Sequence, residues 1–63
     1  MRAFIETENR GFVNANFRRG QRLPETFWYD ETTAQTFTLD QTETLLQLLE
    51  NNCIEVRRAV YVR

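Results

Sequence analysis

The chain has 63 residues and a formal net charge of −1, and its eight basic residues are all arginine. A chain of this length is expected to fold as one domain, residues 1–63, too small to enclose a deep substrate cleft. It contains no histidine, lysine or serine, so the commonest general base, Schiff-base amine and hydroxyl nucleophile are missing. We therefore expect neither enzymatic activity nor a bound cofactor or metal.

The charges fall into three blocks. Residues 1–22 contain five arginines and two glutamates, residues 23–55 contain seven acids and no base, and residues 56–63 contain three arginines. A bipolar charge distribution does not determine a fold, but it steers association with charged partners.

The composition also bears on location. Cys53 is the only cysteine, which rules out an internal disulfide and favours a reducing compartment. Its position between the helix end and a run of β-branched residues predicts a buried, small apolar side chain; the alternative is a reactive thiol. The early Glu6 does not fit a secretory signal, and no apolar run is long enough to span a membrane. We expect a cytoplasmic protein.

Two β-hairpins are predicted in the first two thirds of the chain. In the first, residues 2–7 and 11–18 flank a turn at Glu8–Gly11, and Val13, Ala15 and Phe17 alternate with polar residues as in a half-buried strand. Phe12 falls on the polar face of that strand. Residues 18–25 form a connection.

The second hairpin is expected over residues 26–39, with its loop at Asp30–Ala34. The aromatic run Phe27-Trp28-Tyr29 favours a strand. In a regular strand Trp28 points opposite to its two neighbours.

A helix follows this hairpin. Asp40 and Glu43 fit a capping box, and Thr42, Leu45, Leu46 and Leu49 then occupy one helical face. The two asparagines at 51–52 are predicted to end the helix, because either tolerates a left-handed backbone.

The last segment, residues 53–63, is predicted to be a strand with a β-bulge near Arg57 and Arg58, which interrupt its alternation. The expected fold is thus α+β: a mostly antiparallel sheet of about five strands, with one amphipathic helix packed on it. The second face and the edges of such a sheet need covering, and a homodimer would cover them.

Two surfaces are candidates for binding. The first combines arginines with outward-facing aromatic residues, and the last strand would extend it if it neighbours the aromatic strand. This surface consists of Arg18, Arg19, Arg22, Trp28 or Tyr29, Arg57 and Arg58. The alternative is that these arginines form salt bridges with the acidic middle block.

The second surface is acidic and would face a basic partner, in the extreme case by mimicking nucleic acid; the alternative is an ordinary solvated surface. Its residues are Asp30, Glu31, Glu43 and Glu50.

From these surfaces we expect a non-enzymatic protein-interaction module that modulates, as an inhibitor does, a larger partner protein. Compact accessory proteins of phages and mobile elements are similar in size and composition. The alternative hypothesis is a single-stranded nucleic-acid-binding module, although the isoelectric point near 5.3 is low for such a domain.

Overall fold

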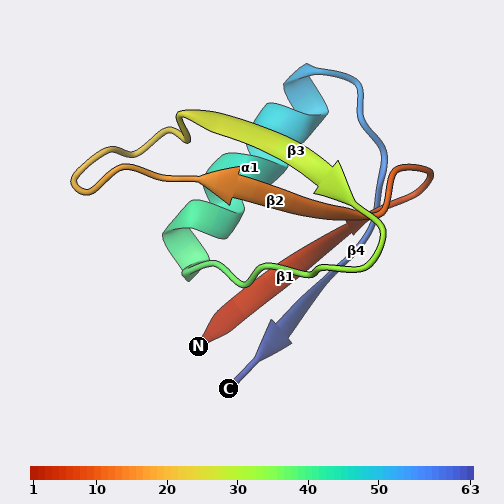
Figure 1. Ribbon diagram of the computed structural model, residues 1–63, viewed down its shortest axis with the longest axis horizontal. Helices are drawn as coiled ribbons and strands as arrows, with labels where there is room; N and C mark the ends of the chain where they lie inside the picture. Colours follow the sequence, from red (N-terminus) through yellow and green to blue (C-terminus); the bar gives the residue numbers. More distant parts are fainter.

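A computed structural model describes the whole chain, residues 1–63. It has four strands and one helix, and the strands form one antiparallel sheet in the order β3-β2-β1-β4. The helix lies against one face of this sheet (Figure 1). The predicted α+β class is confirmed, whereas the predicted five strands are one too many. The elements are β1 (Arg2–Thr7), β2 (Phe12–Asn16), β3 (Thr26–Asp30), α1 (Leu39–Asn51) and β4 (Val56–Val62).

The first hairpin forms as predicted, with a shorter second strand. β1 and β2 pair at Glu6 and Phe12, and the backbone N–H and the hydroxyl of Thr7 both donate to the Gly11 carbonyl, at 2.8 and 2.7 Å. Gly11 has a φ of 87°, in the region that glycine adopts without a Cβ penalty. β3 then pairs with β2 along its whole length.

The second hairpin predicted for residues 26–39 does not form. Phe37 makes only an isolated bridge to Ala3, through two backbone hydrogen bonds of 2.9 and 2.7 Å. Beside it, Gln35 Oε1 accepts from the Ala15 N–H at 2.9 Å. β1 and β2 diverge here, so the segment 33–37 occupies the gap and supplies the missing backbone partners.

α1 begins two residues earlier than predicted. Its N-cap is Thr38, whose hydroxyl accepts from the Gln41 N–H at 3.2 Å, while Gln41 Oε1 accepts from the Thr38 N–H at 3.0 Å. This is a capping box, so the predicted cap at Asp40 and Glu43 is wrong. Both tetrapeptides fit the pattern, and the earlier start ends the extended chain directly after the buried Phe37.

The end of α1 corrects two further predictions. The left-handed residue is Cys53, with a φ of 59°, and not an asparagine. The N–H groups of Cys53 and Ile54 donate to the carbonyls of Glu50 and Leu49 at 3.0 and 2.9 Å, which is the Schellman pattern. Cys53 is exposed, not buried, because Ile54 is the residue that packs against the core from this turn.

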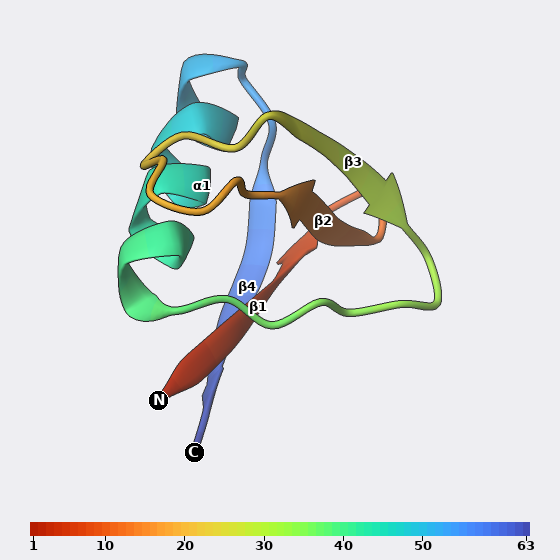
Figure 2. The same cartoon turned by 60° about the vertical axis from the view of Figure 1, so that its left-hand side comes forward.

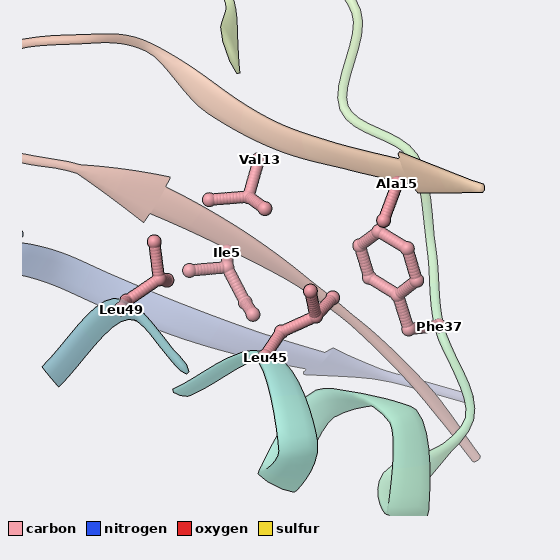
Figure 3. Packing of buried hydrophobic residues seen from close by; sticks show 6 residues of the cluster. All are labelled: Ile5, Val13, Ala15, Phe37, Leu45 and Leu49. Carbon is pink, nitrogen blue, oxygen red and sulfur yellow. The ribbon is translucent and has the colours of Figure 1, made fainter. Parts of the chain in front are cut away.

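The core lies between the sheet and α1. Ile5, Val13 and Ala15 point from the sheet toward Leu45 and Leu49 of the helix, and Phe37 closes one end (Figure 3). The predicted apolar face of the helix is confirmed: Thr42, Leu45 and Leu49 are buried.

β4 pairs with β1 from Arg2–Val62 to Thr7–Val56, and the register shifts between Glu6 and Thr7. This shift leaves Arg57 as an extra residue on β4, which confirms the predicted bulge. The pairing also brings the two ends of the chain together (Figure 1).

Candidate protein-interaction surface

The sheet face opposite α1 carries an apolar patch. Phe4 pairs directly with Val60 across β1 and β4, and the rings of Phe4 and Phe12 make an edge-to-face contact with centroids 5.7 Å apart. Val62, next on the same face of β4, is 38% exposed. Figure 2 shows no second helix or sheet over this face. We call Phe4, Phe12, Val60 and Val62 the open-face patch.

The charged side chains that border this patch are hydrogen-bonded within the chain. The Arg58 Nε donates to Glu6 Oε1 at 2.7 Å. The Arg2 guanidinium donates to the hydroxyl and the carbonyl of Thr36, at 2.9 and 2.7 Å. The patch is therefore an apolar surface with a polar rim, an arrangement typical of protein interfaces.

The structure decides which of the two candidate aromatic residues faces outward. Trp28 pairs with Asn14 on the open face and is 46% exposed. Tyr29 points to the opposite face, where it packs against the core and the Arg10 guanidinium lies 5.4 Å from its ring centroid. The segment 33–37, between β1 and β2, separates Trp28 from Phe4 of the open-face patch.

Two of the three arginines of the 18–25 connection, Arg18 and Arg22, lie near acids of the same molecule. Arg18 and Glu25 form a two-bond ion pair, at 2.6 and 2.9 Å. Arg22 lines an open cleft of about 490 Å³ together with Asp40 and Glu43, and no apolar residue lines it. Arg19 is exposed, and it is the one arginine of the connection that has no acidic side chain in these contacts.

Arg57 and Arg58 do not extend that group. β3 and β4 form opposite edges of the sheet, so the condition that their strands be neighbours is not met. Arg57 donates to Glu8 at 3.3 Å, and Arg58 to Glu6. Of the expected salt bridges with the acidic middle block, only the Arg18–Glu25 pair is present; the others join residues of the two terminal blocks.

The four acidic candidates separate into two groups. Asp30 is the last residue of β3 and Glu31 follows it; this end of the strand lies away from α1 in both views (Figures 1 and 2). Glu43 and Glu50 are exposed on α1, and Glu43 lies beside Arg22 in the cleft.

Asp30 is fixed by the turn that follows it. Its Oδ1 accepts from the backbone N–H of Thr32 and of Thr33, at 2.8 and 2.9 Å, and from the Thr32 hydroxyl. These hydrogen bonds, that from the Thr32 backbone first, lower the pKa of Asp30. The carboxylate therefore keeps its charge at the end of β3.

The sequence alone did not identify the open-face patch as a unit. The position of Phe12 among polar residues was a signal of such a patch, because a large apolar side chain on the outer face of a strand often marks an interaction site. Its neighbours Phe4 and Val60 could be assigned to that face only once the strand pairing was known.

The helix is too short and too polar to cross a membrane. No cluster of three or more cysteine, aspartate or glutamate side chains is arranged to hold a metal ion. No protein-family model, curated protein or solved structure matches the chain.

Proposed function

We propose that the chain is a non-enzymatic protein-interaction module that docks on a larger protein through the open-face patch. The observation that supports this is the partial exposure of the patch on a sheet face with no second helix or sheet over it: Phe4, Phe12 and Val60 are half-buried and Val62 is exposed. An interface of ordinary size takes about 800 Å² from each partner, roughly a sixth of the 4632 Å² surface of this chain. The patch and its rim supply the centre of such an interface.

The charge of this surface favours protein over nucleic acid as the partner. Arg58 is paired with Glu6, and Arg2 is hydrogen-bonded to the neutral Thr36 and keeps its charge, so the rim offers phosphates one uncompensated cation and not a row of them. A partner with exposed apolar side chains and a few acceptors at its rim matches the patch better.

The proposal extends to inhibition of that partner in the cytoplasm. A domain of this size adds little chemistry of its own, but it occludes a surface as large as its own interface. This extension rests on the analogy with compact accessory proteins of phages and mobile elements. Self-association is proposed as well, at the sheet edges and not at the patch.

Single-stranded nucleic acid remains the second candidate. Trp28 is exposed enough to stack on a base, and Arg19 lies in the preceding connection. Binding of this kind predicts retention on heparin that falls steeply with added salt.

The test is capture of partners by the tagged chain, with and without nuclease, using two matched variants. Phe12→Thr removes an aromatic ring from the patch and keeps a strand-forming residue. Leu23→Thr removes an exposed apolar side chain from the 18–25 connection and serves as the control. Circular dichroism checks that both variants fold.

We expect one stoichiometric protein that survives nuclease treatment, is captured by Leu23→Thr and is lost with Phe12→Thr. Capture of that protein by both variants alike would refute docking on the patch. Capture that disappears with nuclease would favour the nucleic-acid hypothesis.

A further inference from the structure

Both edges of the sheet present unpaired backbone groups. β4 is a terminal strand, and its partner residue Ala3 uses its N–H and carbonyl to bond Phe37, away from β4. Antiparallel ladders alternate, so the residue paired with Ala3, Tyr61, directs its own N–H and carbonyl outward from the sheet. Ala59, two residues earlier, does the same.

The same reasoning applies to β3, the other terminal strand. The Ala15 N–H of β2 bonds the Gln35 side chain, on the side away from β3. Its partner Phe27 therefore directs its backbone groups outward, and so does Tyr29, two residues further.

Natural edge strands are usually protected by charges, prolines or bulges. On β4 these features are confined to Arg57 and Arg58, where the bulge lies. The rest of the strand, Ala59–Val62, carries neither charge nor proline. This stretch is thus free to accept a further strand.

The two edges fit each other in direction. β3 runs parallel to β1 and β4 antiparallel to it, as the pairings of the sheet require. A second copy placed beside the first in the same orientation therefore sets its β3 antiparallel to β4, which continues the ladder of the sheet.

One register satisfies the hydrogen bonds and the charges together. If Ala59 and Tyr61 pair with Tyr29 and Phe27 of the next copy, Val60 falls opposite Trp28 on the open face. In the same register three arginines in or next to β4 fall opposite acids in or next to β3, and these contacts add to the ion pairs that Arg57, Arg58 and Glu25 make within their own copy. The pairs between copies are Arg58 with Asp30, Arg57 with Glu31 and Arg63 with Glu25.

Symmetric pairings bring like charges together. A β4–β4 ladder centred on Val60 sets Arg57 against Arg63, and a β3–β3 ladder centred on Trp28 sets Glu25 against Glu31. Like charges directly opposite destabilise a sheet and opposite charges stabilise it. The charge blocks of the chain thus favour pairing of β4 with β3 over pairing of two β4 or two β3 strands.

We propose that the chain associates head to tail, with β4 of one copy pairing antiparallel to β3 of the next in this register. This inference specifies the proposed self-association and is independent of docking on the open-face patch. A head-to-tail contact leaves one β3 and one β4 free. Adjacent strands twist by about 20–25°, so four strands turn each added copy by roughly 90° and growth is helical and open-ended.

The test uses disulfide trapping between variants in a Cys53→Ala background. Val60 and Trp28 form a non-hydrogen-bonded pair in the proposed register, where Cα atoms approach to about 4.5 Å and a disulfide fits. We expect Trp28→Cys mixed with Val60→Cys to give a covalent heterodimer under mild oxidation. Val62→Cys, on the same face of β4, is the matched control and should not link to Trp28→Cys.

Sedimentation velocity of the unmodified chain should show species that grow with concentration beyond a dimer. A monomer at every concentration would overturn the inference. So would a Val60→Cys homodimer formed in place of the heterodimer, because that product indicates symmetric β4 pairing. Phe12→Thr should assemble like the unmodified chain, so failure of the edge contact and failure of docking on the patch are distinguishable.

Discussion

Gly11 and Gly20 form a pair of sites that tests the packing of the first turn. Both have positive φ, 87° and 81°. A Cβ at Gly20 meets no atom within 4 Å, whereas a Cβ at Gly11 would lie 2.6 Å from the Asp30 carbonyl oxygen and 2.9 Å from the Glu31 Cα. The two alanine substitutions therefore share the backbone strain and differ in the clash.

The expected costs follow from these contacts. The left-handed conformation costs an alanine about 1 kcal/mol, which is the whole effect of Gly20→Ala. Gly11→Ala adds a forced backbone shift at the end of β3, typically about 1–3 kcal/mol, for a total near 3 kcal/mol. A chain of 63 residues has a total stability of only about 3–9 kcal/mol, so Gly11→Ala removes a large share of it.

Urea unfolding followed by Trp28 fluorescence measures both variants. With a slope of about 1 kcal/mol per molar urea, the midpoint should fall by about 1 M for Gly20→Ala and about 3 M for Gly11→Ala. Equal losses would contradict the close packing of the first turn against Asp30 and Glu31.

Three further predictions concern single side chains. Thr38→Ala should cost about 1 kcal/mol of unfolding free energy in urea, and Asp40→Ala only a few tenths, because the hydroxyl of Thr38 is the cap; the reverse order would place the cap at Asp40. Cys53→Gly should gain about 0.5 kcal/mol by relieving the left-handed strain, with Cys53→Ala as a neutral control; a loss for glycine would contradict the positive φ. Since the folded pKa of Asp30 is lowered, its charge stabilises the fold above its ordinary pKa, and this contribution is lost as the pH falls through the lowered value. Stability measured against pH should therefore show the advantage over Asp30→Asn shrinking below about pH 3.8, and a constant difference would refute the role of the charge.

Local sequence patterns predicted the secondary structure correctly in segments where only one arrangement fits the pattern. The leucine spacing identified the buried helix face, and alternation identified β2 and placed Trp28 opposite to Phe27 and Tyr29, but only the structure shows that Trp28 is the one that faces outward. The interruption at Arg57 and Arg58 located the bulge.

Prediction failed where two local solutions competed and tertiary contacts chose between them. Thr38 and Asp40 each begin a capping pattern, and residues 35–39 alternate like a strand. The burial of Phe37 in the gap between β1 and β2 explains both outcomes. The extended segment ends after one bridge, and the helix begins directly afterwards with Thr38 as its N-cap. The exposure of Cys53 depends likewise on Ile54 packing against the core.

The candidate surface was less predictable than the fold. The charged residues could be found in the sequence, but their partners could not, because Arg57 and Arg58 are paired with Glu8 and Glu6, about fifty positions away in the chain. The open-face patch likewise depends on the strand order, which brings Phe4 and Val60 side by side.

The most direct test of docking on the open face is an NMR titration of the isotope-labelled chain with the purified protein that it captures. Docking on the patch predicts that the largest shifts occur at the side chains of Phe4, Phe12, Val60 and Val62. Shifts concentrated in the 18–25 connection, with the patch unchanged, would contradict it.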